Sequence, residues 1–515
     1  MPDQRRPNNS IAIPAMVAML ATIVFRLPEL LNPGIVNSDS AVVGLQAMHI
    51  LRGEWHWFLW GSGYQTTVDS VVAAGLFAVM GATPLALICT ALSGHLLSVL
   101  FALLTLSRRL SAWAALFLVS PLILSSAPTH TYTLHPPRQT ALTIVFAAIW
   151  LLDGAAHARR AWVRFAFGAA LGTFACFADP YALVFLPGVA LLSVLSLFDV
   201  DASRKVRLGR AVAAVVGAGI GAIPFVRLRS LPQSRGGPLT LTHDLLAHNW
   251  QLFKGPCLQW VLGTRVLHQP AGASDYLVWK PPVEFFLIQW LGVAVFVAGL
   301  LTAVALAGTR KIPWELRRLA LMGFVTVIVT IVGFLFSVMP MDHYSSRYLV
   351  ALVLVVPFVF APAAHLLGPM RVACLVSPMV MSFAVSGWLG YEPCVRGLRI
   401  INNHLSESEA RLRHALTSRK IKYATADYWA AYRLTFMFQE KVTVVPIHEK
   451  QDRYAPYRQR FDRAAQYAYI YDHRRSEESM HTVESRVALG LKERFSVGDF
   501  DVYIVDRAAP AGISR

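Results

Sequence analysis

The sequence predicts a mostly α-helical, polytopic membrane protein that ends in a small soluble α/β domain. Of the 515 residues, 55% are hydrophobic and only 15% are charged, whereas soluble domains carry about 25% charged residues. Apolar runs near the length that crosses a ~30 Å hydrocarbon core recur between residues 11 and 388. After residue 391 the chain is polar and contains no such run. These observations divide the chain into a membrane domain, 1–390, and a soluble domain, 391–515.

We expect about eleven membrane-spanning helices, and up to thirteen if re-entrant helices are counted. The expected spans are 11–31, 84–106, 112–127, 139–153, 163–178, 181–198, 209–226, 284–307, 316–338, 347–365 and 371–388. A short basic segment precedes the first span, and no small-residue cleavage site follows it. We therefore interpret the first span as a retained helix and not as a cleaved signal peptide.

Basic residues in the connectors predict which side of the membrane each loop occupies. Arg5 and Arg6 place the N-terminus in the cytoplasm under the positive-inside rule. Five later connectors then fall on the same side, at 108–109, 157–160, 204–207, 309–318 and 371. The apolar run 68–82 is too short for a full crossing, and counting it would reverse every later connector. We interpret it as a juxtamembrane or re-entrant helix of the first outer loop.

This topology predicts a multi-pass protein of the inner (plasma) membrane with large extracytoplasmic segments. These are the first outer loop, 32–83, a second long loop, 227–283, and the C-terminal domain. The second loop contains a pattern at 244–250 that is typical of an amphipathic helix lying on the membrane. In the C-terminal domain, helices at 407–419, 427–438, 456–464 and 483–493 are expected to alternate with strands at 442–445, 467–471 and 500–505.

Charge and cysteine content exclude several classes of function. The net charge of +17 resembles that of a nucleic-acid-binding protein, but many Lys and Arg residues lie in the membrane connectors, and we expect no nucleic-acid partner. No GxGxxG motif or P-loop is present, so nucleotide binding is not supported. The five cysteines have no metal-ligand spacing. A disulfide between Cys257 and Cys394, both outside the spans, is left open.

Three carboxylates in the first outer loop are candidates for catalysis. Asp39 begins a helical pattern that ends at Gly53. The group 38–40 either caps this helix or supplies Asp39 as a general base that takes a proton from an acceptor. Glu54 and Asp69 are either solvated surface residues or partners of Asp39. Their spacing gives no metal signature.

Aromatic and basic residues supply candidates for substrate binding. The first outer loop carries an aromatic patch that forms either an interfacial belt or a wall for a sugar ring or polyprenyl chain: Trp55, Trp57, Phe58, Trp60 and Tyr64. Arg347 lies at the outer end of an apolar span, where it either snorkels or binds a lipid phosphate. Arg138 and Lys280 are weaker candidates of the same kind. For His135 and His343 a local structural role is favoured.

Three stretches resemble one family of enzymes. The segment 39–51, followed by Gly53, Gly61, the sequence Gly63-Tyr64-Gln65 and Asp69, resembles the first outer loop of bacterial GT-C type glycosyltransferases. These enzymes use polyprenyl-phosphate donors and are related to protein mannosyltransferases and aminoarabinose transferases. The sequence Arg347-Tyr348-Leu349 with Pro357 resembles another segment of such enzymes. The segments 426–435 and 453–457 resemble the C-terminal domain of uncharacterised bacterial members.

The resemblance implies a GT-C-like fold and a membrane glycosyltransferase of the cell envelope. It would transfer a sugar, with inversion, from a polyprenyl-phosphate donor to an extracytoplasmic glycan, lipid or protein. Asp39 would be the general base, Asp69 the second catalytic carboxylate and Arg347 the contact to the donor phosphate. We group five further residues with the substrate-binding site: Glu54, Tyr64, Arg138, His343 and Tyr348.

The chain departs from the family pattern in two places. Ser40 stands where these enzymes usually have a second acidic residue, and segment 135–139 lacks the paired acids that bind metal in oligosaccharyltransferases of this class. A divalent metal is therefore not supported, and no other cofactor is expected. Two alternatives stay open. One is a transporter or flippase for a lipid-linked saccharide, and the other is a non-catalytic protein of cell-envelope glycan assembly.

Overall fold

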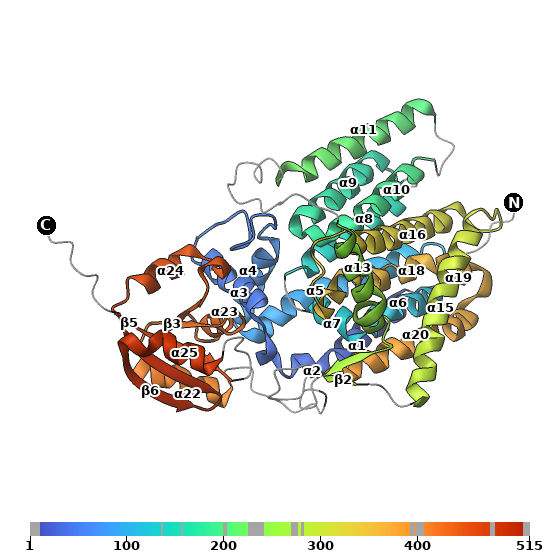
Figure 1. Ribbon diagram of the computed structural model, residues 1–515. Coiled ribbons are helices and arrows are strands. Elements are labelled where there is room, and N and C mark those ends of the chain that lie inside the picture. Colours follow the sequence, from blue (N-terminus) through green and yellow to red (C-terminus); the bar gives the residue numbers. More distant parts are fainter. Residues whose placement is uncertain are drawn as a thin grey trace.

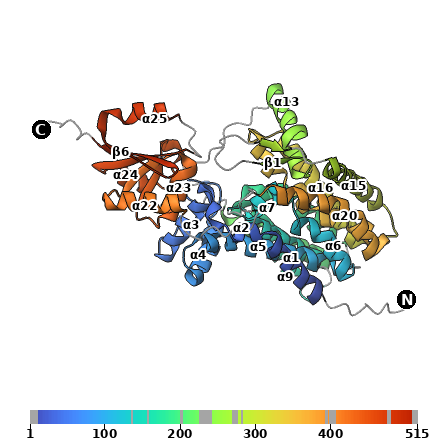
Figure 2. The same cartoon turned by 90° about the horizontal axis from the view of Figure 1, so that it is seen from below.

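A computed structural model describes residues 11–134, 137–155, 158–198, 203–224, 242–268, 277–279, 283–391, 396, 406–473 and 479–507. Five residues discussed above, Arg5, Arg6, His135, Lys280 and Cys394, lie outside these ranges. The protein is mostly helical, and a five-stranded sheet lies near its C-terminus. Figures 1 and 2 show a large helical bundle with the sheet domain beside it, next to α3 and α4.

The bundle is built largely from apolar helices. Its membrane-domain helices are α1 (Ala12–Phe25), α2 (Leu27–Leu30), α3 (Ser38–Leu51), α4 (Val68–Met80), α5 (Pro84–Leu106), α6 (Ala112–Ile123), α7 (Ala127–Leu134), α8 (Gln139–Asp153), α9 (Ala161–Ala178), α10 (Leu186–Ser196), α11 (Arg204–Gly221), α13 (His243–Leu252), α14 (Leu258–Val261), α15 (Val283–Ala307), α16 (Trp314–Leu335), α17 (Ala351–Leu354), α18 (Val356–Val359), α19 (Ala361–Leu367) and α20 (Pro369–Leu389). Two short strands, β1 (Val266–His268) and β2 (Leu277–Trp279), pair antiparallel.

Within the described residues, six helical stretches are long and apolar enough to cross a membrane. They are Pro84–Leu106, Ala161–Ala178, Phe285–Leu306, Trp314–Leu335, His343–Leu367 and Pro369–Leu389. Five shorter apolar helices accompany them, among them Val68–Met80. These helices are the mark of an integral membrane protein, and the finer prediction of eleven spans stays a prediction.

Several expected spans are interrupted, and the first and the tenth show the physical reasons. The first, 11–31, breaks at Arg26, which is fully buried and donates to the carbonyl oxygen of Ile123. The span expected at 347–365 is divided into a 3₁₀ helix (η4, His343–Leu349) and the short helices α17, α18 and α19. Pro357 and Pro362 stand in the first turns of α18 and α19. Each proline lacks the amide hydrogen that a continuous helix needs.

The C-terminal domain alternates helices and strands. Its elements are α22 (Glu407–Ser418), β3 (Tyr423–Ala426), α23 (Tyr428–Met437), β4 (Thr443–Pro446), α24 (Ala455–Asp462), β5 (Gln466–Asp472), α25 (Met480–Val487), β6 (Leu491–Val497) and β7 (Phe500–Asp506). The strand order is β4-β3-β5-β7-β6. β3 pairs parallel with β4 and β5, whereas β7 pairs antiparallel with β5 and β6. The helix expected at 483–493 was wrong in its second half, because residues from Leu491 onward alternate in burial and pair as the edge strand β6.

The C-terminal domain shares a hydrophobic core with the first outer loop. One continuous cluster of buried side chains joins residues of α3, α4 and the start of α5 to residues of α22, α23 and the central strands. The ring of Phe436 on α23 stacks near Phe77 of α4, with centroids 6.1 Å apart. A methyl group added at Gly44 of α3 would lie 2.8 Å from the same ring. The domain therefore packs directly onto α3 and α4.

Candidate active site

Asp39 stands in the first turn of α3 but does not cap the helix. The cap is Asn37, whose side-chain oxygen accepts a hydrogen bond from the Ser40 amide at 2.9 Å. The expectation that group 38–40 forms the cap was therefore wrong. Because Asn37 and not Asp39 accepts the hydrogen bond from the Ser40 amide in the first turn, the Asp39 carboxylate can bind other groups.

Two residues of the C-terminal domain hold one oxygen of Asp39. The Tyr428 hydroxyl donates to Asp39 Oδ1 at 2.5 Å, and Arg453 Nη2 lies 3.7 Å from the same oxygen. Arg453 Nε in turn donates to the Tyr428 hydroxyl at 3.1 Å. Among the described residues, Asp39 Oδ2 has no partner, and the side chain is 38% exposed. One oxygen is therefore held by the C-terminal domain, while the other has no hydrogen-bond partner among the described residues.

The fold of the C-terminal domain brings these two residues together. Tyr428 follows the carboxyl end of β3, and Arg453 lies beyond the carboxyl end of the neighbouring parallel strand β4. Groups beyond the carboxyl ends of adjacent parallel strands meet at one edge of a sheet, where α/β domains commonly bind ligands. Burial and the nearby Asp39 charge raise the pKa of Tyr428, so its hydroxyl stays protonated and remains a donor.

Backbone contacts fix α23 against α3 at the same place. Ser38 Oγ donates to the Tyr428 carbonyl oxygen at 2.6 Å, and Arg433 Nη2 donates to the Gly34 carbonyl oxygen at 2.7 Å. The buried Arg433 also pairs with Glu409 of α22. These contacts anchor the start of α23 and thereby hold Tyr428 beside Asp39.

Asp69 occupies a different and closed environment. Its side chain is buried, with 2% exposure, at the start of α4. Oδ1 accepts from the Thr140 hydroxyl at 2.6 Å and the Thr140 amide at 3.3 Å, and Oδ2 accepts from the Arg138 amide at 3.4 Å. Burial is the main cause that raises the pKa of Asp69. The carboxylate thus closes the N-terminus of α8.

Arg138 pairs with an acidic residue that sequence analysis did not select. Arg138 Nε lies 3.4 Å from Oδ2 of Asp179, which also accepts from Gln65 Nε2 at 3.2 Å. The Arg138 guanidinium lies over the Tyr181 ring, 5.0 Å from its centroid. The available signal was the position of Asp179 at a helix end on the same predicted face as Asp69.

Arg347 lies on η4 and is connected to this group through Tyr181. The Tyr181 hydroxyl accepts from the Ala351 amide at 2.6 Å, one helical turn after Arg347. Arg347 Nη2 donates to the Tyr348 hydroxyl at 3.1 Å. Its Nε is buried and has no hydrogen-bond partner among the described residues. The guanidinium therefore retains binding capacity.

The remaining predicted residues divide between the docking interface and the loops. Glu54 accepts from Tyr454 at 3.1 Å and contacts His49 at 2.8 Å, so it joins the loop to the C-terminal domain. Tyr64 is 53% exposed. His343 packs beside Tyr344, with ring centroids 4.3 Å apart. Of the aromatic patch, Trp55 and Trp57 are exposed, whereas Trp60 is buried and stacks on Tyr454.

Two segments of the first outer loop link the Asp39 site to the group formed by Asp69, Arg138 and Asp179. Gln46 of α3 accepts from the Ser70 hydroxyl at 2.8 Å. Asp39 lies seven residues before Gln46, which is about 10 Å along a helix. The turn 61–65 contacts both groups, since the Gly61 carbonyl oxygen accepts from Arg453 at 3.2 Å and Gln65 donates to Asp179. No contact among the described residues joins Asp39 to Asp69 or to Arg347.

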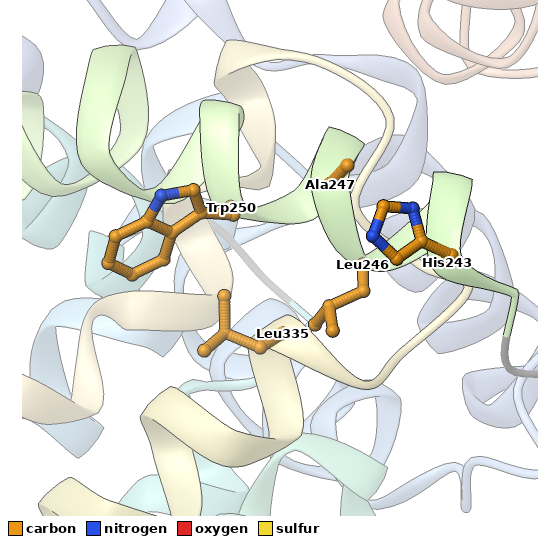
Figure 3. A pocket seen from close by; sticks show the side chains of 5 residues that line it. All are labelled: His243, Leu246, Ala247, Trp250 and Leu335. Carbon is orange, nitrogen blue, oxygen red and sulfur yellow. The ribbon is translucent and has the colours of Figure 1, made fainter.

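Two apolar cavities lie away from this site. One of about 310 Å³ lies between α13 and the end of α16 and is lined by His243, Leu246, Ala247, Trp250 and Leu335 (Figure 3). The other, of about 380 Å³, lies among α1, α15 and α20 and is lined by Phe25, Leu124, Phe285, Ala384, Val385, Trp388 and Leu389. Neither contains a predicted site residue. In the described part of the chain, no three His, Cys, Asp or Glu residues are grouped as metal ligands.

Comparison with known proteins identifies the fold. No protein-family model and no curated protein matches the chain. The crystal structure of ArnT from Cupriavidus metallidurans in the apo state matches with a TM-score of 0.57 and 14% identity, covering 96% of this chain and 97% of that chain. The same protein bound to undecaprenyl phosphate matches with a TM-score of 0.56 and 12% identity, over the same shares of both chains.

An oligosaccharyltransferase from Archaeoglobus fulgidus in the apo form matches at a TM-score of 0.47 and 8% identity, covering 86% of this chain and 65% of that chain. The likeness to ArnT extends through both the membrane helices and the C-terminal domain, since it covers nearly all of both chains. The resemblance seen in the sequence is thereby confirmed at the level of the fold, since this chain has the fold seen in the two ArnT structures.

Proposed function

We propose that the chain is a membrane glycosyltransferase that moves a sugar from a polyprenyl-phosphate carrier to an extracytoplasmic acceptor. The fold of ArnT supports the class of reaction, and the ArnT crystal structure bound to undecaprenyl phosphate supports the class of donor. The observation that carries the proposal is the partly exposed Asp39 carboxylate, which is held through Oδ1 and has no partner at Oδ2 among the described residues.

In this mechanism Asp39 Oδ2 takes the proton of the acceptor hydroxyl. The acceptor oxygen forms a bond to the anomeric carbon on the face opposite the phosphate. The bond from that carbon to the phosphate oxygen breaks, and its electron pair stays on the phosphate, so the configuration inverts. General base catalysis of this kind contributes about 10²- to 10⁴-fold.

Arg347 would bind the leaving phosphate, because its buried Nε has no hydrogen-bond partner among the described residues. A guanidinium that donates to a developing phosphate charge lowers the barrier by electrostatic stabilisation. We place Arg138, Tyr348, Tyr64 and His343 around the donor. We assign supporting roles to Glu54 and Asp69, because other residues already bind their carboxylates. Glu54 is hydrogen-bonded to His49 and Tyr454, and Asp69 to Thr140 and the Arg138 amide.

The test measures release of polyprenyl phosphate by the purified, full-length protein. A panel of synthetic polyprenyl-phosphate sugars is incubated with the protein and an extract of cell-envelope acceptors, and the lipid product is separated by chromatography. We expect D39N to lower release by at least about 10²-fold. The matched control is D244N, which changes an exposed Asp in the first turn of α13. Full activity of a folded D39N protein would contradict the assignment.

A further inference from the structure

We infer that the C-terminal domain completes the active site, with Tyr428 and Arg453 as positioning residues that orient the Asp39 carboxylate for proton transfer. The inference rests on the proposed function. It assigns a working role to a domain that the sequence separates from the catalytic loop by more than 380 residues. The membrane helices alone do not supply these two contacts.

The first step is the geometry of the carboxylate. Asp39 Oδ1 accepts from the Tyr428 hydroxyl at 2.5 Å and faces Arg453 Nη2 at 3.7 Å. A general base must come within hydrogen-bond distance of the proton that it removes. The Asp39 side chain is partly exposed and has no other partner among the described residues, so without these two residues it is free to change rotamer. Fixing Oδ1 fixes the direction in which Oδ2 points.

The second step is the support behind Arg453. Its amide donates to the Tyr432 hydroxyl at 2.5 Å, its Nη1 donates to the Gly61 carbonyl oxygen at 3.2 Å, and its Nε donates to Tyr428 at 3.1 Å. Arg453 is thus held by three hydrogen bonds, of which two are made by its guanidinium, and one of these two reaches the first outer loop. A planar guanidinium with fixed donors holds a partner more rigidly than an ammonium group does.

The same interface supplies a matched control. The Tyr454 hydroxyl also donates to a carboxylate of the first outer loop, Glu54, at 3.1 Å, but it does not contact Asp39. Y428F and Y454F therefore each remove one tyrosine-to-carboxylate hydrogen bond across the interface. Only Y428F acts on the proposed base.

The experiment measures kcat and KM for the polyprenyl-phosphate donor that gives the best release above. We expect Y428F to lower kcat by about 10-fold or more, as for the loss of a hydrogen bond to a charged group, with little change in KM. R453K, which keeps the charge but loses the forked contacts, should show the same pattern. Y454F should change kcat less than threefold. Thermal unfolding in detergent checks that the three variants fold.

A double-mutant cycle separates positioning from a purely structural role. If Tyr428 acts through Asp39, adding Y428F to D39N causes little further loss, whereas independent effects add. Additive losses, or equal kcat for Y428F and Y454F, would overturn the inference and leave the proposed function standing. Full activity of D39N would instead refute the proposed function itself. The two failures are therefore distinguishable.

Discussion

Gly61 of the first outer loop packs directly against Arg453 of the C-terminal domain. It has a φ angle of +66°, and an added Cβ would lie 2.4 Å from Arg453 Cδ and 2.7 Å from Arg453 Cα. A side chain at this position therefore meets both an unfavourable backbone conformation and the backbone of Arg453. Such an approach is available only to glycine.

Replacing Gly61 should displace Arg453 and weaken catalysis. We expect G61A to lower both the unfolding midpoint and kcat, because Arg453 must move away from the turn and from Tyr428. The control is G53A, which has a φ angle of +89° and open space around the added Cβ. G53A thus reports backbone strain alone, about 1–2 kcal/mol, and should keep kcat. Equal behaviour of the two variants would show that Arg453 does not pack against this turn.

At the scale of elements, a charged cluster joins the end of α3 to the C-terminal domain. His49 lies 2.8 Å from Glu54 and 2.8 Å from Glu440, which follows α23. Burial opposes the charged form of His49, but hydrogen bonds to Glu440 and Glu54 outweigh it and raise the pKa of His49. Burial likewise opposes the charge of Glu440, yet the hydrogen bonds from His49 and Tyr457 lower its pKa to about 2.

This cluster predicts a pH window for the docking of the domain. The His49 contribution is complete below its ordinary pKa of about 6.5 and is lost as pH rises through the raised pKa. The Glu440 contribution is present above about 4.5 and is lost as pH falls toward 2. We expect the unfolding midpoint to fall on the alkaline side, and this fall to be smaller in H49Q. The measurement is thermal unfolding in detergent from pH 5 to pH 9, and parallel curves for the two proteins would contradict the assignment.

Local sequence patterns predicted the helices and strands more accurately than they predicted which side chains contact one another. The helices at 84–106 and 139–153 have the expected bounds, because long apolar runs with clear ends specify them. The edge strand β6 was missed because only its pairing with β7 distinguishes it from a helix. Asp39 and Arg347 could be chosen from their residue types and positions. Their partners could not, since Tyr428 reaches Asp39 through the packing of α23 on α3.

For the whole molecule, two polar groups lie at opposite ends of the same helices. Asp179 follows the last residue of α9, and Asp69 closes the N-terminus of α8. At the other end of α8, the fully buried Asp153 pairs with Arg108, Arg109 and Arg318. The 15 residues of α8 rise about 22 Å, so the two groups are separated by most of a hydrocarbon core. Asp153 thus forms ion pairs with arginines of two basic connectors, 108–109 and 309–318, that sequence analysis assigned to the cytoplasmic side.

This arrangement predicts the sidedness of the chain. Arg310 lies in a basic connector between α15 and α16, whereas Ser418 ends α22 and Trp57 lies in the first outer loop, and all three are exposed. In a chain whose five cysteines are replaced, we expect a membrane-impermeant thiol reagent to label W57C and S418C in intact cells. R310C should be labelled only after permeabilisation, because we expect the basic connectors to lie on the cytoplasmic side. Both ends of α4 also contact outer segments, since Asp69 binds Thr140 and the Ala82 carbonyl accepts from Gln439. V79C should therefore never require permeabilisation for labelling. Labelling of R310C from outside would reverse the topology and move the Asp39 site to the cytoplasm.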